Sequence, residues 1–320
     1  MNLLAILAAL GLEQWHAPGW RVTIERAYVR QARSLERMFN GGTARHGAVA
    51  AAIAILPPVI VAGLAWWALD ALHPLAALAL DVVVLYALMG FRRFSHAVST
   101  IVAAFREGDL DAARRALEAW RGRSSAELGS GDLARLAIER GFVDAYRQVF
   151  AVLFWFVLLP GPTGAILYRV TARLAQEWAK PRPGDDLTPV LRDREAFGRP
   201  VRHLLDLLDW IPVRLTAIAF AAVGDFEDAI ASWRTQAASW AREEGGKAMG
   251  IVLASGAGAL GVVLGGPLPS PEGEPDWRAE LGTGEPVEPE VLPSAVGLVW
   301  RALVLWLAVI LLVTIASLLP

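Results

Sequence analysis

The chain has 320 residues, of which 55% are hydrophobic, and its formal net charge is −2 at pH 7. A nearly balanced charge gives no overall electrostatic attraction to nucleic acid, so a nucleic-acid-binding function is not expected. Cysteine is absent, which excludes disulfides, thiolate metal sites and a cysteine nucleophile.

Four long apolar stretches dominate the chain, and they cover residues 47–72, 75–91, 149–168 and 302–319. Each reaches or approaches the roughly 20 residues that cross a hydrocarbon core about 30 Å thick. We therefore expect an all-α fold: a polytopic α-helical integral membrane protein with cytoplasmic and interfacial helices. We also expect one membrane domain over residues 1–320, because a large part of the chain lies in the spans.

The N-terminal run, residues 2–12, resembles the apolar core of a signal peptide. No basic segment precedes it, and the Glu13-Gln14-Trp15-His16 that follows is not a small-residue cleavage site. A retained, short membrane segment is therefore favoured over a cleaved signal. Residues 21–46 then carry six arginines ahead of the first long span.

The first two spans are separated by His73-Pro74 alone, which predicts a tight helical hairpin. Arg92-Arg93 follows the second span, so both open ends of the hairpin are basic while its turn is uncharged. The positive-inside rule then places the open ends in the cytoplasm and the turn outside. We expect a multi-pass protein of the bacterial inner (cytoplasmic) membrane with its basic loops in the cytoplasm.

Residues 92–148 are expected to form a polar helical insertion on the cytoplasmic side. Ten arginines lie in it. Asp109 is a candidate cap for a first amphipathic helix, and Ser130 or Asp132 is a candidate cap for a second one. Apolar side chains recur at helical spacing in both helices, which is typical of burial against a neighbouring helix rather than of a functional face.

The third apolar stretch, residues 149–168, lies between two basic segments, 92–148 and 169–202. A simple crossing would put one of those segments outside the cell, against the positive-inside rule. Pro160-Gly161-Pro162 interrupts the stretch, so the alternative is a broken or re-entrant helix with both ends in the cytoplasm. The sequence leaves these two alternatives open.

Polar and apolar segments alternate in the second half of the chain. We expect a polar loop at 180–200, a surface helix at 225–244 and an exposed acidic, proline-rich loop at 267–295. Residues 248–266 are uncharged and rich in glycine and alanine, and they are long enough to span the membrane or to enter and return. The dinucleotide pattern GxGxxG at 256–261 lacks a strand–turn–helix context, so close packing of helices is the favoured interpretation.

Three charged residues, Asp206, Asp209 and Arg214, interrupt the apolar segment 204–223. Charges inside a membrane are costly and are functional candidates by default. Asp209 and Arg214 flank Pro212, and two interpretations remain: an internal ion pair that fixes a helix break, or a ligand site. The five histidines show no metal-ligand spacing, so no metal site is expected.

Four segments, in the right order, resemble the CobD/CbiB family of membrane proteins. Leu208–Gly224 resembles the family's Pro-Ala-Arg-Leu region, and Ala254–Gly266 resembles its glycine- and alanine-rich segment ending in Leu-Gly-Gly. Phe105–Arg114 and Leu159–Arg169 also fit the family pattern. The resemblance covers nearly the whole chain.

The family's named enzyme is the adenosylcobinamide-phosphate synthase of cobalamin biosynthesis, which joins an aminopropanol-type amine to a corrinoid carboxylate and so forms an amide. The resemblance implies this role for the chain, with a corrinoid substrate and a divalent cation if the synthase activity is retained. The implied partners are the lipid bilayer and either a corrinoid ligand or a membrane protein, and no nucleic acid. A related branch of the family, AmpE, is linked to the regulation of β-lactamase induction, and Leu208–Leu215 is closer to that branch.

The chain departs from the synthase pattern where the family's polar residues cluster. The family's Glu-Asn-Thr-x-Asp-Gly stretch reads Val143–Val152 without its Glu, Asp and Pro, and its Asn-Thr-Leu-Asp reads Ala172–Ala175. Its Gly-Arg-Asp-Thr reads Gly122–Ser125 and lacks the acid. The catalytic motifs are thus largely degenerate, and enzymatic activity stays open. The remaining polar candidates for catalysis are Asp144, Asp206, Asp209 and Arg214. The alternative function is that of a non-catalytic, AmpE-like membrane modulator of cell-wall and β-lactamase signalling.

Overall fold

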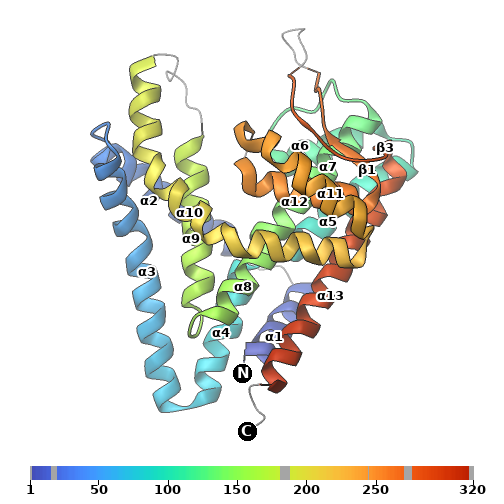
Figure 1. Cartoon of the computed structure of the whole chain (residues 1–320). Coiled ribbons are helices and arrows are strands. Elements are labelled where there is room, and N and C mark those ends of the chain that lie inside the picture. The colour runs from blue at the N-terminus through green and yellow to red at the C-terminus, as the bar shows by residue number, and fades with distance from the viewer. Residues whose placement is uncertain (1, 16–19, 181–187, 244, 270–275, 317–320) are drawn as a thin grey trace. The chain divides into compact units, whose positions relative to one another are not determined.

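The structure is a computed structural model that describes residues 2–15, 20–180, 188–243, 245–269 and 276–316 (Figure 1). The chain divides into two compact units. Unit 1 comprises the residues up to Met89 together with Ala151–Asp209, and unit 2 comprises Gly90–Phe150 together with the residues from Trp210 onward.

Unit 1 is built from helices, and they are α1 (Asn2–Trp15), α2 (Trp20–Phe39), α3 (Ala44–Leu72), α4 (Pro74–Leu88), α8 (Ala151–Leu158), α9 (Thr163–Ala179) and the first part of α10 (Thr188–Val223). Unit 2 contains the rest of α10, further helices and a small sheet. Its helices are α5 (Phe91–Arg106), α6 (Leu110–Arg121), α7 (Ser130–Ala145), the π-helix η1 (Tyr146–Phe150), α11 (Phe226–Gln236), η2 (Ala237–Arg242), α12 (Gly246–Leu260), η3 (Pro289–Val291) and α13 (Leu292–Ala316). Its strands are β1 (Val262–Gly265), β2 (Glu280–Gly282) and β3 (Glu285–Pro286).

The predicted fold class, a helical membrane protein, is confirmed. Within the described residues, the sheet is limited to three short strands in the order β2-β1-β3, with Leu264 of β1 opposite Leu281 of β2 in an antiparallel pair. By length and composition, three helical stretches of the described chain could cross a membrane: Ala44–Leu72, Ser130–Leu158 and Pro289–Ala316. The second of these is the continuous run of α7, η1 and α8.

The long helix α3 has a buried side and an exposed apolar side. Ala50 and Ala54 are buried, whereas Val61, Leu64 and Trp67 are each more than 60% exposed. Soluble proteins rarely expose a contiguous apolar surface of this kind, and a hydrocarbon environment suits it better than water does.

The predicted hairpin between the first two apolar stretches is present as α3 and α4, joined by one short turn (Figure 1). His73 caps both helices: its backbone N–H donates to the Leu69 carbonyl at 2.8 Å, and its Nδ1 accepts from the Leu75 N–H at 3.1 Å. Pro74 occupies the first turn of α4, where a missing N–H has no helical partner to lose. α4 ends at Leu88 after 15 residues, so it is shorter than the predicted second stretch.

The third apolar stretch, residues 149–168, does not form one continuous helix, and a broken or re-entrant helix was one of the two alternatives for it. α8 ends before Pro160-Gly161-Pro162, Gly161 adopts a left-handed φ of 57°, and α9 folds back onto α8. The two helices approach so closely that a Cβ added to Gly164 would lie 2.0 Å from the Trp155 carbonyl oxygen. A helix that turns back at its proline break supports the broken or re-entrant alternative over a simple crossing.

The expected polar loop at 180–200 is wrong over its second half, because α10 begins at Thr188 and continues for 36 residues through Pro212. A proline inside a helix leaves the carbonyl four residues earlier without its usual donor. Here that carbonyl belongs to Leu208, and it accepts a hydrogen bond from Trp155 Nε1 at 3.1 Å. The helix break expected at Pro212 is likewise wrong, because a side chain of a neighbouring helix replaces the lost N–H.

The glycine-rich segment 248–266 does not form one membrane-length helix. α12 ends where Gly261 adopts a left-handed φ of 67°, and β1 follows. The interpretation as a packing surface is supported, since a Cβ added to Gly258 would lie 2.3 Å from the Asp228 carbonyl oxygen of α11. The expected loop at 267–295 is wrong in part, because β2, β3, η3 and the start of α13 lie within it.

Candidate functional site

Unit 1 contains a cavity of about 840 Å³ lined by α2, the end of α4 and α9. We call it the basic cavity, because its lining includes seven basic side chains and two acidic ones: Arg21, Arg26, Arg30, Arg33, Arg169, Arg173, Lys180, Glu25 and Glu177. Ile24, Val29 and Leu88 add apolar lining. A cavity with this charge balance attracts anions, although several of its cations, such as Arg26 and Arg30, are exposed to solvent.

Helical spacing explains why so many cations line one cavity. Arg26, Arg30 and Arg33 of α2 recur at intervals of three or four residues, and Arg169 and Arg173 of α9 are four residues apart. Side chains at these intervals share one face of a helix. The packing of α2 on α9 then turns both basic faces toward the same space.

Two hydrogen bonds fix α2 against α9 beside the cavity. The Tyr28 hydroxyl donates to the Val170 carbonyl at 3.2 Å, and Trp178 Nε1 donates to the Ala32 carbonyl at 3.1 Å. Burial raises the pKa of Tyr28, so its hydroxyl remains a neutral donor at physiological pH. Neutral hydrogen bonds therefore hold the cavity wall together with the ion pairs Arg33–Glu177 and Arg173–Glu25, which also join α2 to α9.

Arg21 is the least exposed cation on α2 that lines the cavity, with 15% of its side chain exposed. Its Nη1 donates to the buried Glu13 carboxylate at 3.0 Å, and its guanidinium lies 4.9 Å from the centre of the Tyr86 ring. Its Nε and Nη2 are buried and have no hydrogen-bond partner in the described structure. A buried donor without an acceptor costs about 1–3 kcal/mol, so this edge of Arg21 lowers the stability of the packing around it.

The two glutamates of the lining are each shared between cations. Glu25 lies 2.5 Å from Arg173 and 4.0 Å from Arg169. Glu177 accepts from Arg33 at 3.3 Å and also from the lysine that follows α9. Because only two carboxylates pair with four cations, the lining keeps an excess of positive charge.

Unit 2 contains Asp144, a predicted site residue, on α7. Its buried carboxylate accepts from Trp120 Nε1 at 3.0 Å and from Arg140 Nε at 3.1 Å. α7 then passes into the π-helix η1, in which Arg147 and Gln148 are also buried. Arg147 Nε and Gln148 Oε1 have no hydrogen-bond partner within the described residues. A π-helix is frequent at functional sites, so η1 is a second candidate site.

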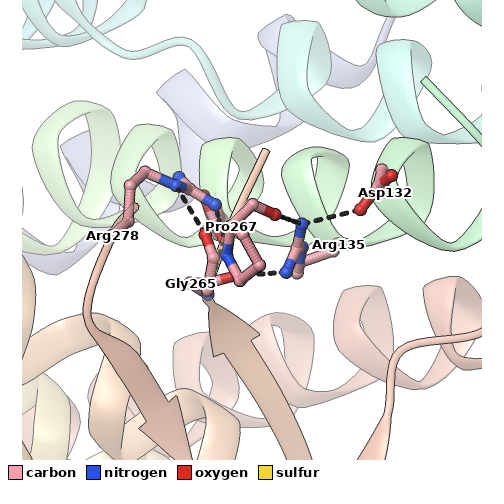
Figure 2. A network of polar contacts seen from close by, with 7 residues as sticks. Asp132, Arg135, Gly265, Pro267 and Arg278 are labelled. Atoms are coloured by element: carbon pink, nitrogen blue, oxygen red, sulfur yellow. Dashed lines mark hydrogen bonds and ion pairs between the residues drawn. The ribbon is translucent and has the colours of Figure 1, made fainter. Parts of the chain in front are cut away.

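A dense polar network in unit 2 joins α7 to β1 and to the chain that follows it (Figure 2). Glu139 accepts from the Gly265 N–H at 2.9 Å and from both terminal nitrogens of Arg278, at 2.7 and 3.0 Å. Arg135 donates to the carbonyls of Gly265 and Pro267 and pairs with Asp132 at 2.6 Å. Figure 2 shows both guanidinium groups directed at the same short backbone segment. Arg135 Nε is buried without a partner in the described residues, but the other donors and acceptors named here are paired, so we interpret the network as structural.

The other predicted site residues lie along α10. Asp209 is buried and accepts from the Tyr168 hydroxyl at 2.9 Å, whereas Arg214 donates to the Trp210 carbonyl and lies 4.4 Å from the Trp210 ring centre. Of the two interpretations of Asp209 and Arg214, the internal ion pair is therefore wrong, because residues five apart point about 140° away from each other around a helix. Desolvation raises the pKa of Asp206.

The four predicted site residues are divided between the two units. Asp206 and Asp209 belong to unit 1, whereas Asp144 and Arg214 belong to unit 2. The basic cavity was missed by sequence reasoning, although the recurrence of arginine on an amphipathic α2 was a signal for it. In the described part of the chain, no group of three histidine or acidic side chains could hold a metal ion.

Comparisons with known proteins agree over most of the chain. A sequence model of the family described as CobD/Cbib protein matches residues 6–299. A cobalamin biosynthesis protein CobD of Stutzerimonas stutzeri (strain A1501) is 34% identical over 312 residues, which cover 96% of each chain. A protein of the same name from Chromobacterium violaceum is 35% identical over 262 residues, which cover 82% of this chain and 78% of the relative. No solved structure matches the chain.

Proposed function

The chain belongs to the CobD/CbiB protein family, and from this we propose that it acts in cobalamin biosynthesis. The proposed reaction is the one that the resemblance implies: an aminopropanol-type amine and a corrinoid carboxylate form an amide. One carboxylate oxygen must leave, so the reaction also needs a co-substrate such as a nucleoside triphosphate, whose phosphoryl group activates the carboxylate and departs with that oxygen. We place the protein in the bacterial inner membrane with its basic segments in the cytoplasm. The observation that carries the proposal is 34% identity over 96% of both chains, which includes the apolar helices and the polar segments alike.

The segments that resemble the family's motifs give the chain's own residues a place in this proposal. Val143–Val152 covers Asp144 and the π-helix η1, and Ala172–Ala175 covers Arg173 of the basic cavity. In the proposed reaction, Asp144 would keep Arg140 and Trp120 in position through its two hydrogen bonds. Arg147 Nε, three residues further along, has no partner among the described residues and is a donor that would orient a carboxylate.

The divalent cation that the resemblance implies does not fit the residues described. Hard cations need several oxygen ligands at one place. The Asp144 carboxylate already accepts from Arg140 and Trp120, and the lining of the basic cavity has a positive excess. We therefore route no step of the proposed reaction through a metal ion.

A second candidate, the AmpE-like modulator without catalysis, is favoured by one specific observation. Where the family's Asn-Thr-Leu-Asp stands, this chain has Arg173 and Ala175, and Arg173 lines the basic cavity beside Glu25. Ala175 stands where the family has its Asp, and Arg173 stands where the family has its Thr. A site that lacks the acid and has gained a cation suits binding of an anion better than acid–base chemistry.

Growth of a bacterial strain that lacks its own CobD-type protein tests the proposed function. We expect the chain to restore growth on a corrinoid that still has its free carboxylate, and Asp144→Ala to reduce that growth at equal protein level. A corrinoid that already carries the amide should support growth without the chain, which controls for later steps. Failure of the wild-type chain, with the protein found in the membrane, would favour the modulator.

A further inference from the structure

We propose that the part of α10 in unit 2 lies along the surface of the phospholipid bilayer, with its exposed apolar face among the acyl chains and Arg214 at the headgroup phosphates. The inference goes beyond the proposed function, because it assigns a partner to α10 whichever reaction the protein performs. It also develops the second interpretation of Arg214, a contact with a ligand, which remains once the internal ion pair with Asp209 is excluded.

The part of α10 that follows Asp209 has one buried face and one exposed face. On the buried face, Val213, Ala217 and Phe220 are each no more than 1% exposed. The exposed face consists of the half-buried Arg214 and four apolar side chains that are 40–58% exposed: Trp210, Ile211, Leu215 and Ile218. We call these five residues the α10 stripe, because they recur at intervals of three or four and so share one side of the helix.

The bilayer surface suits α10 better than a crossing does. α10 is not among the helical stretches of the described chain that could cross a membrane by length and composition, whereas α13 of the same unit belongs to one of them. Val304, Leu312 and Val313 of α13 are 58–66% exposed on several sides, as expected for a helix surrounded by hydrocarbon. The second half of α10 is not parallel to α13 (Figure 1). With α13 across the bilayer, α10 therefore lies closer to the membrane plane.

Ring contacts within unit 2 place α10 at the level where the headgroups give way to the acyl chains. The Phe150 ring centre lies 6.0 Å from that of Phe220 of α10 and 5.6 Å from that of Trp306 of α13. Trp306 follows Arg301, the last charged residue of α13, by five residues, which is about 8 Å along a helix. Arg301 is exposed, and a cation at such a position extends to the headgroups.

The pair of Arg214 and Trp210 matches the chemistry of the headgroup level. The Arg214 guanidinium lies 4.4 Å from the Trp210 ring centre, and its Nη1 donates to the Trp210 carbonyl. Its Nε and Nη2 have no hydrogen-bond partner in the described chain, and neither is a buried atom, so a lipid phosphate can accept from them. Tryptophan and arginine are both typical of this level, because each has an apolar body and a polar tip.

Charge also favours the bilayer over a second copy of the chain. Arg214 is the central residue of the α10 stripe, and the stripe contains no acid. Two copies that packed symmetrically through this stripe would bring their Arg214 side chains together without a carboxylate between them. The surface of a bilayer with anionic lipids supplies the missing negative charge.

Depth measurements on the full-length chain in vesicles of phosphatidylcholine and phosphatidylglycerol test the proposal. Because the chain has no cysteine, single nitroxide labels can be attached at Ile211→Cys, Leu215→Cys and Ile218→Cys. Electron paramagnetic resonance, with oxygen and a water-soluble nickel chelate as relaxants, gives the depth of each label. We expect all three labels at one similar depth, about 5–10 Å below the headgroups. Val304→Cys and Leu311→Cys, also seven residues apart but on α13, are the matched control and should differ in depth by up to about 10 Å.

The role of Arg214 is tested by Arg214→Leu in the chains labelled at positions 211 and 218. Both labels should move toward the deep end of the range of about 5–10 Å, because no cation then holds the helix at the phosphates. Arg234→Leu removes an exposed cation of α11 outside the stripe, so it is the control and should leave both depths unchanged. Equal depths in the Arg214→Leu and wild-type backgrounds would overturn the assignment of Arg214 to the headgroups.

Three results would overturn the position of α10 itself. A depth that changes along α10 as it does along α13 would mean that α10 crosses the bilayer. Labels as accessible to the nickel chelate as in water would place α10 outside the membrane, and labels sheltered from both relaxants would show that a protein covers the stripe. None of these results depends on growth on corrinoids, so failure of this inference and failure of the proposed function can be told apart.

Discussion

Asp209 is a buried carboxylate of unit 1 that is bound by a hydroxyl. Only 3% of the residue is exposed, and the Tyr168 hydroxyl donates to it at 2.9 Å. The half-buried Arg214, five residues further along α10, interacts with Trp210 instead. A charge sequence such as Asp-x-x-x-x-Arg therefore does not predict an ion pair when the segment is helical.

Removal of the Tyr168 hydroxyl tests this contact. We expect Tyr168→Phe to lower the free energy of unfolding by about 1–3 kcal/mol, because a buried carboxylate loses a donor. Tyr28→Phe removes a hydrogen bond to the neutral Val170 carbonyl, so its effect should be smaller, about 1 kcal/mol. Thermal unfolding of both purified variants in detergent makes the comparison. A larger loss for Tyr28→Phe would contradict this ranking.

Glu139 is expected to be the most sensitive position of the polar network in unit 2. Replacing it with alanine leaves the Arg278 guanidinium, which is 11% exposed, without its carboxylate. Breaking a buried ion pair on one side typically costs about 3–5 kcal/mol. Glu118→Ala, at an exposed position on α6, is the control and should change little. Equal thermal stability of the two variants would show that the network contributes nothing.

At the scale of elements, the contact between α8 and α9 depends on a glycine. A Cβ at Gly164 would lie 2.0 Å from the Trp155 carbonyl oxygen, so Gly164→Ala must push the two helices apart. Gly297 of α13 has open space around it, and Gly297→Ala should be neutral or stabilising by up to about 1 kcal/mol. Yield of monodisperse protein after detergent extraction measures both. Normal yield for Gly164→Ala would mean that α8 and α9 do not pack as described.

The fold of α8 back onto α9 also predicts the topology of the basic segments. Single cysteines can be introduced into this cysteine-free chain, and we expect a membrane-impermeant thiol reagent to label His73→Cys from outside intact cells. Ser130→Cys and Lys180→Cys should be protected, because the positive-inside rule keeps both basic segments in the cytoplasm. Labelling of Lys180→Cys would show that the 149–168 segment crosses the membrane after all.

Across the whole molecule, the sequence could predict helices and turns formed by neighbouring residues, but not contacts between segments that are far apart in the chain. The spans α3 and α13 follow from the length and apolarity of one continuous run, and the α3–α4 turn follows from His73-Pro74. The basic cavity needs α2 and α9 together, and its tie between Tyr28 and Val170 joins residues 142 positions apart. Single-chain patterns contain no information on such a pairing. Sequence could not predict that α10 stays helical through Pro212 for the same reason. The Leu208 carbonyl, which lacks its usual N–H donor because of Pro212, accepts a hydrogen bond from Trp155 of α8, a distant residue in the sequence.

The proposed amide formation belongs to the molecule as a whole, and it can be measured directly as transfer of nitrogen. Membranes that contain the chain would be incubated with an adenosylated corrinoid carrying a free carboxylate, with ATP to activate that carboxylate, and with a ¹⁵N-labelled aminopropanol-type amine, as its phosphate in a parallel sample. Membranes with the Stutzerimonas stutzeri relative, which is 34% identical, would serve as the comparison. We predict a corrinoid amide that contains ¹⁵N, detected by mass spectrometry and absent from membranes without the chain. A labelled amide from the relative but none from this chain, at equal amounts of protein, would contradict the proposed synthase function.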